Sequence, residues 1–171
     1  MKKIIALAVL LAALTSLFGC KSKMYKDITY KEGGISFTLP NTMRRVEMDD
    51  YDFYFTDRAT VFTATELKDE FYKENSYPKD MTAKQYVDIC MEKNEMDPEN
   101  MEYIYDEEKN IHSFRYAYDN REDVSVFYYV VVTGDPGNIW YIEMCCSYSE
   151  SYYYTSTFGA WKNTILAYNE N

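Results

Sequence analysis

The single histidine of the chain, His112, is the first side chain to consider for catalysis. A histidine base can activate a serine nucleophile, but no serine of this sequence lies in a nucleophile-elbow pattern. Alternation along a strand places His112 on one face with Phe114, Tyr116 and Tyr118, which favours a structural or surface role. The residues therefore predict no catalytic site and no enzyme activity.

Acidic residues close together in the sequence raise the question of a metal site. Asp49, Asp50, Asp52 and Asp57 could offer oxygen ligands to calcium, but their spacing is not that of an EF-hand loop. Two carboxylates could also serve glycoside hydrolysis, yet with 28 acidic residues some pair meets the required separation by chance. We expect a solvated acidic loop, with no metal and no cofactor.

Three cysteines, Cys90, Cys145 and Cys146, lie outside the amino-terminal segment, so one thiol must stay unpaired within a monomer. A bridge between Cys145 and Cys146 is disfavoured, because neighbouring Cα atoms are only about 3.8 Å apart and neighbours in a strand point to opposite faces. Whether Cys90 pairs with Cys145 or Cys146 is open. A Cys90–Cys146 bridge requires the helix of Cys90 to cover the Cys146 face, and three buried thiols are the favoured interpretation.

Tyrosine is unusually frequent, with 19 residues, and most of these rings suit half-buried sheet positions. In a helix, Tyr154 continues an apolar stripe, whereas Tyr152 and Tyr153 are expected at the surface. Exposed tyrosines can anchor an envelope protein or stack on a glycan. A flat aromatic patch would indicate an interaction or assembly module, whereas a small-ligand binder needs a pocket of several hundred Å³.

The amino-terminal segment has the layout of a secretory signal. Lys2 and Lys3 precede fifteen uncharged residues, 4–18, which as a helix reach only about 22 Å of a hydrocarbon core roughly 30 Å thick. We therefore expect the segment to be removed. Its end, Leu17-Phe18-Gly19-Cys20, resembles the lipobox of bacterial lipoproteins. The resemblance implies a diacylglycerol on the Cys20 thiol and cleavage before that residue.

This assignment divides the chain into a lipoprotein signal peptide (1–19), a lipidated basic tether (20–29) and a single domain (30–171). Acyl chains hold a protein on a membrane without spanning it, so we expect the domain at the extracytoplasmic face of a cell membrane. Residues 20–31 carry four lysines and one aspartate, whereas residues 32–171 carry 27 acidic and 12 basic residues. That charge argues against nucleic acid as a partner.

Alternation of apolar and polar residues predicts strands at 35–39, 51–56 and 59–67, and a meander at 101–105, 111–118, 124–132 and 139–148. The strand at 124–132 is apolar on both faces and should lie near the middle of a sheet. Thr82 and Gln85 form a capping box before a helix that runs to about residue 94. A second helical face joins Tyr154, Phe158, Trp161, Ile165 and Tyr168.

Connections between these elements are too short for crossovers, so we expect an α+β fold. It is a layered α/β/α sandwich with a mainly antiparallel sheet of six or seven strands and two packed helices.

The order of elements resembles that of the PsbP-like family, which includes the photosystem II extrinsic protein. The resemblance rests on the strand Gly34-Ile35-Ser36-Phe37-Thr38-Leu39-Pro40, the single mid-chain helix, the strands ending in Ile139-Trp140-Tyr141-Ile142, and a closing helix with Phe158 and Trp161. It implies a binding or assembly factor with an unidentified partner, and no functional residues of the family map onto this chain. A cystatin-like lipoprotein domain is the structural alternative.

Overall fold

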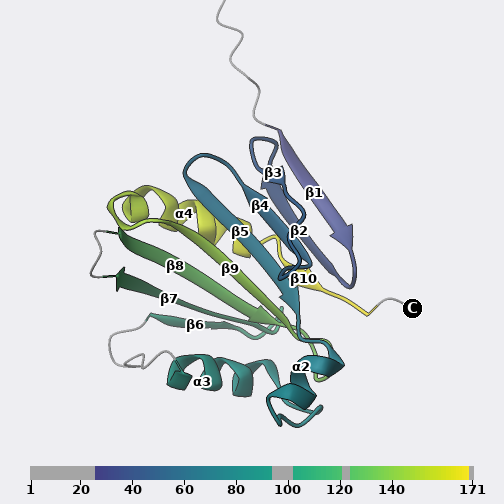
Figure 1. Ribbon diagram of the computed structural model, residues 1–171. Coiled ribbons are helices and arrows are strands. Elements are labelled where there is room, and N and C mark those ends of the chain that lie inside the picture. Colours follow the sequence, from purple (N-terminus) through teal and green to yellow (C-terminus); the bar gives the residue numbers. More distant parts are fainter. Residues whose placement is uncertain (1–25, 94–101, 121–123, 170–171) are drawn as a thin grey trace, which may run out of the picture.

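The computed structural model describes residues 26–93, 102–120 and 124–169 (Figure 1). The strands are β1 (Asp27–Glu32), β2 (Ile35–Pro40), β3 (Arg44–Arg45), β4 (Phe53–Thr56), β5 (Thr60–Glu66), β6 (Tyr103–Asp106), β7 (Ile111–Asn120), β8 (Val124–Thr133), β9 (Trp140–Ser147) and β10 (Leu166–Ala167). The helices are α2 (Asp69–Glu74), α3 (Ala83–Lys93) and α4 (Ser151–Lys162), with a 3₁₀ turn, η2 (Tyr148–Glu150), before α4.

The strands form two antiparallel sheets. The larger sheet has seven strands in the order β3-β4-β5-β9-β8-β7-β6, and the smaller has the order β1-β2-β10. Helix α4 and the smaller sheet lie on one face of the larger sheet, and α2 and α3 lie on the opposite face (Figure 1). Buried side chains form one core on each of these two faces. The expected layered α+β fold with a mainly antiparallel sheet is therefore confirmed.

Most strands lie where alternation predicts them. In β2, Ile35, Phe37 and Leu39 are buried while the residues between them are half-buried. The meander from β6 to β9 is present, and its strand β8 is covered on both faces, since Val130 and Val131 are both fully buried. Strand β9, beside β8, is the central strand of the sheet.

The start of α3 follows from the capping box. The backbone N–H of Thr82 donates to Gln85 Oε1 over 2.8 Å, and the N–H of Gln85 donates to Thr82 Oγ1 over 3.2 Å. Ala83, Val87 and Cys90 are buried against the larger sheet. The predicted capping box is therefore confirmed, and the buried residues form one apolar stripe along the helix.

The predicted closing helix is too long. Helix α4 ends at Lys162, and the chain then forms β10, in which Leu166 pairs with Ser36 of β2. Thr164 fixes this exit, because its Oγ1 donates to the carbonyl of Trp161 and accepts the N–H of Thr38. The spacing of apolar residues past Lys162 fits both a helix and an extended segment, and the open edge of β2 decides between them.

Strand β1 begins within the segment expected to be tether. Gly33 and Gly34, with φ of +64° and +85°, make the turn that folds β1 onto β2, so residues 27–29 belong to the smaller sheet. Only residues 21–26 then separate Cys20 from the sheet, a reach of about 22 Å at most. Cys20 and residues 1–19 lie outside the described residues.

Two further findings concern the helices. Helix α2 was not anticipated, because six residues are too few to show a helical period. Within the described ranges, no helix has the length and apolar character needed to cross a bilayer.

Candidate functional site

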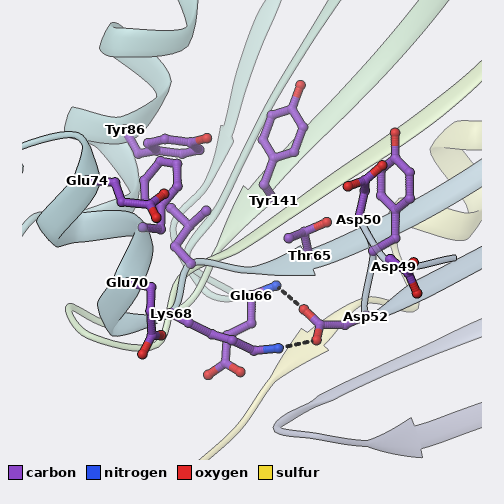
Figure 2. A pocket seen from close by; sticks show the side chains of 13 residues that line it. Asp49, Asp50, Asp52, Thr65, Glu66, Lys68, Glu70, Glu74, Tyr86 and Tyr141 are labelled. Carbon is purple, nitrogen blue, oxygen red and sulfur yellow. Dashed lines mark hydrogen bonds and ion pairs between the residues drawn. The ribbon is translucent and has the colours of Figure 1, made fainter.

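A cavity of about 530 Å³ opens on the α3 side of the larger sheet (Figure 2). We call it the acidic tyrosine cavity. Its walls come from the loop before β4, the end of β5, helix α2, and one tyrosine each from α3 and β9. Segments far apart in the sequence therefore meet here.

Four aromatic rings from four elements line the acidic tyrosine cavity: Tyr51, Phe71, Tyr86 and Tyr141. The ring of Tyr86 meets that of Phe71 edge to face, with centroids 5.7 Å apart, and that of Tyr141 with centroids 5.9 Å apart. These contacts join α2, α3 and β9 into one aromatic wall. Burial raises the pKa of both Tyr86 and Tyr141, so their phenols are neutral at physiological pH.

Six carboxylates line the same cavity: Asp49, Asp50, Asp52, Glu66, Glu70 and Glu74. Glu70 and Glu74 lie on one side of it and Asp49 and Asp50 on the other (Figure 2). Among the described residues of the lining one is basic, Lys68, and it is paired with Asp52. The cavity therefore has a strong excess of negative charge.

Asp52 has a structural role in the lining of the acidic tyrosine cavity. Its Oδ2 accepts the backbone N–H of Glu66 over 2.8 Å, and its Oδ1 accepts a hydrogen bond from Lys68 Nζ (Figure 2). This bond raises the pKa of Lys68. Asp52 thus ties the loop before β4 to the end of β5.

A further carboxylate, Glu143, lies on β9 two residues beyond Tyr141 and on the same face of the sheet. Tyr141 Oη donates to Glu143 Oε2 over 2.9 Å. Burial raises the pKa of Glu143. The pKa of Tyr51 is raised by burial and then by the Glu143 charge, which extends the negative potential of the cavity along the sheet.

The sequence-predicted acidic cluster is brought together only in part. Asp49, Asp50 and Asp52 line the acidic tyrosine cavity, whereas Asp57 holds the β4–β5 turn by accepting the N–H groups of Ala59 and Thr60, each over 2.8 Å. In the part of the chain that the structure describes, no three His, Cys, Asp or Glu side chains are grouped to hold a metal ion.

His112 lies at a different cavity, of about 560 Å³, beside the amino-terminus of α3; we call this the His112 cavity. Its side chain is buried, and Nδ1 lies 2.6 Å from Tyr103 Oη. The ring of Tyr105 stacks on the imidazole with centroids 4.4 Å apart. Burial lowers the pKa of His112. No serine, cysteine or carboxylate is among the described residues that line this cavity.

The thiols lie on both faces of the larger sheet. Cys146 packs with Ile142 and Met144 in the α4 core, whereas Cys90 packs in the α3 core on the opposite face. A Cys90–Cys146 bridge is therefore wrong, because its condition, that α3 covers the Cys146 face, is not met. Cys90, Cys145 and Cys146 all carry thiols, and burial raises the pKa of each to about 11.

Tyr152 and Tyr153 lie on α4, with 87% and 73% of their surfaces exposed. Tyr154 packs against Phe158 with ring centroids 5.7 Å apart. The predicted division of this tyrosine run into one core-facing and two surface residues is confirmed.

Sequence reasoning missed the aromatic wall of the acidic tyrosine cavity. Tyr86 was visible as the fourth residue of α3, and alternation along β9 placed Tyr141 and Glu143 together, opposite the Trp140 face. No local signal could show that these residues face α2 and the loop before β4.

No protein-family model matches the chain, and a search of curated proteins finds no match. Among solved structures the chain is similar to cyanobacterial PsbP (CyanoP) from Synechocystis sp. PCC 6803, with a TM-score of 0.54 and 14% identity over 86% of this chain and 96% of that one. It is also similar to a protein from Bacteroides thetaiotaomicron VPI-5482, with a TM-score of 0.53 and 11% identity over 83% of this chain and 48% of that longer one.

A third similar structure is LpqN, described as involved in cell envelope biogenesis of Mycobacterium tuberculosis. Its TM-score is 0.49 and its identity 8%, over 87% of this chain and 94% of that one. At such identities, structural similarity above a TM-score of 0.5 shows the fold alone. The chain has an α+β fold of the PsbP-like type.

Proposed function

We propose that this chain is a lipid-anchored, non-enzymatic binding module at the extracytoplasmic face of a cell membrane, and that it binds a small organic cation. One observation carries the proposal: a cavity of about 530 Å³ combines four aromatic rings with six carboxylates and one lysine. A cavity of this size suits a small ligand better than a flat patch does.

The chemistry of the lining specifies the charge of the ligand. Aromatic faces attract ammonium groups through their quadrupoles, and carboxylates on two sides add a favourable field. Tyr86 and Tyr141 stay neutral, so they offer aromatic rings rather than phenolate charge. An amine or quaternary ammonium compound with a small apolar body can interact with both the aromatic rings and the carboxylates of the lining.

We take the acidic tyrosine cavity as a binding site and not as an active site of the histidine-dependent nucleophilic type. The carboxylates of the acidic tyrosine cavity have no histidine beside them in its lining, because His112 belongs to the other cavity. Catalysis by a nucleophile and a base needs both groups within hydrogen-bond reach. The resemblance to PsbP-like proteins, taken as binding or assembly factors, agrees with this proposal.

The proposed anchor rests on the sequence Leu17-Phe18-Gly19-Cys20, and the early start of β1 sets how far the domain could lie from it. With about 22 Å of chain between Cys20 and the sheet, acyl chains on Cys20 would keep the domain beside the bilayer. Mass spectrometry of the native protein tests this step. We expect residue 20 to be the first residue and to carry a diacylglycerol; an unmodified Cys20 or a retained leader would overturn the anchor but not the cation site.

A titration with choline and with its uncharged isostere 3,3-dimethylbutan-1-ol tests the cation site itself. Selective binding of choline supports the proposal, and equal binding of the two compounds overturns it.

A second candidate function is capture of an envelope protein or glycan through α4. The observation that favours it is the exposure of Tyr152 and Tyr153 at the surface, where the centroids of their rings lie 5.7 Å apart.

A further inference from the structure

The His112 cavity differs in chemistry from the acidic tyrosine cavity. Its described lining is largely apolar, with Ala83, Tyr103, Tyr105 and Pro136, and its one charged residue is Lys84. In a protein with a formal net charge of −10, a cavity whose described lining carries one positive charge and no negative charge is a local exception. It therefore suits a different class of ligand.

His112 supplies a fixed polar group at this cavity. Its residue surface is 5% exposed, and Tyr103 and Tyr105 hold the imidazole by a hydrogen bond to Nδ1 and by ring stacking. Among the described residues no group hydrogen-bonds Nε2, so Nε2 is the ring nitrogen that a ligand can meet. When the Tyr103 hydroxyl donates to Nδ1, the proton of the neutral ring lies on Nε2, which then donates to a ligand.

The amino-terminus of α3 adds further donors. The capping box takes up the N–H groups of Thr82 and Gln85. The N–H groups of Ala83 and Lys84, in the first turn, precede the first intrahelical hydrogen bonds and lie at the positive end of the helix dipole. Thr82, Ala83 and Lys84 all line the cavity. Such a helix start favours an anionic group.

Lys84 supplies the charge. Its Nζ pairs with Asp88 on the next turn of α3 and lies 5.4 Å from the centroid of the Tyr103 ring. Asp88 does not line the cavity, and the Lys84 side chain is half exposed, so the ammonium group can serve an anion there. An ammonium, a buried imidazole and a helix start thus surround a space with aromatic walls.

We infer that the His112 cavity is a binding site for a small carboxylate with an apolar or aromatic body. The carboxylate would accept hydrogen bonds from His112 Nε2, Lys84 Nζ and the first turn of α3, while the body would contact Tyr103, Tyr105 and Pro136. This site is separate from the cation site and does not depend on the proposed function.

Benzoate and its uncharged isostere benzamide are suitable probes, with the mature chain, residues 20–171, carrying Cys20→Ser. His112 is the single histidine, so the imidazole nitrogens of a tag-free ¹⁵N sample report on this residue alone. We expect benzoate, and not benzamide, to shift the His112 ring signals. Because a bound anion favours the imidazolium, benzoate should also raise the pKa of His112.

The groups around His112 determine how a change in its pKa is interpreted. Burial lowers its pKa, the Lys84 charge lowers it further, and Asp88 raises it, while Tyr103 and Tyr105 face it from β6. An increase in its pKa on adding benzoate is the direction expected of a negative charge placed beside the ring and Lys84, whereas further burial alone would lower the pKa.

Lys84→Gln is the decisive variant, with Lys79→Gln as its matched control. Both lysines are exposed and ion-paired, but Lys79 pairs with Asp69 and does not line the cavity. We expect Lys84→Gln to weaken benzoate binding about tenfold, the size of one charge-assisted hydrogen bond, and Lys79→Gln to leave it unchanged. The inference is overturned if benzoate fails to bind, if benzamide binds equally well, if the His112 signals do not move, or if the two variants behave alike.

Discussion

Tyr141 donates a hydrogen bond to Glu143 over 2.9 Å. The two residues lie on the same face of the central strand β9. Alternation along β9 sends Trp140, Ile142 and Met144 into the α4 core and leaves the Tyr141 face toward α3. One face of β9 thus contributes side chains to the α4 core, and its other face contributes Tyr141 to the wall of the acidic tyrosine cavity.

Replacing Glu143 should change stability in a manner that depends on pH. Burial raises the pKa of Glu143 in the folded protein above its ordinary value, so the folded state disfavours the ionised carboxylate. This cost is present above the folded pKa and disappears as the pH falls below the unfolded pKa. We therefore expect Glu143→Gln to raise the free energy of unfolding at pH 7 and to have little effect near pH 4, measured by urea denaturation.

The exposed residue Glu108 provides the control for that comparison, since Glu108→Gln removes the same charge from the surface. A lower stability of Glu143→Gln at pH 7, or a difference from wild type that does not change with pH, would contradict the burial of an ionised carboxylate at β9.

The three thiols should be unreactive in the folded protein. Burial raises the pKa of Cys90, Cys145 and Cys146 to about 11, so at pH 8 only about one thiol in a thousand is ionised. We expect Ellman's reagent to react slowly with the folded chain carrying Cys20→Ser. After unfolding without reductant it should count three thiols; a count of one would show a disulfide and refute the structure at these positions.

Much of the fold could be predicted because its signals are local. Alternation defines β2 and β9, a run that is apolar on both faces defines β8, and Thr82 with Gln85 marks the start of α3 within four residues. The end of α4 could not be predicted in the same way, because the hydrogen bond from Thr38 to Thr164 joins residues 126 positions apart. Helix α4 ends because the following residues bind to β2, and the spacing of apolar residues in the sequence does not show this.

The candidate site was predictable only in fragments. Asp49, Asp50 and Asp52 were recognised as a cluster, but their partners Tyr86 and Tyr141 lie on α3 and β9. These residues become neighbours only when β5 pairs with β9 and α2 packs beside α3. Charge and aromatic content were visible in the sequence; their convergence on one cavity was not.

Charge in the acidic tyrosine cavity should control affinity for a cation. Glu70→Gln combined with Glu74→Gln removes two carboxylates from its α2 side (Figure 2). Partly exposed charges are screened by salt, so we expect choline to bind about three to tenfold more weakly at low ionic strength, and a smaller effect in 0.5 M salt. Isothermal titration calorimetry measures both.

The matched control for this pair is Glu107→Gln with Glu108→Gln, which removes the same charge from the exposed turn between β6 and β7. Equal losses of affinity in the two double variants would mean that choline responds to overall charge and not to this cavity.

Removing the exposed tyrosines tests the second candidate function. We expect Tyr152→Ser combined with Tyr153→Ser to leave the free energy of unfolding within about 0.5 kcal/mol of wild type, because surface changes usually cost little. If α4 captures an envelope partner, crosslinking of the native protein in cells should recover it with wild type and lose it with the double variant. Recovery of the same partner with both proteins would exclude this patch.

The calorimetric comparison of choline with 3,3-dimethylbutan-1-ol tests the central claim most directly, because the two compounds share their shape and differ in charge. Cation–π contacts and carboxylates distinguish them, while the apolar contacts are the same. We predict that choline binds at least about tenfold more tightly than the alcohol, the difference expected from about 1.4 kcal/mol of charge recognition. Equal affinities, or no heat from choline at millimolar concentration, would contradict an organic-cation site in this cavity.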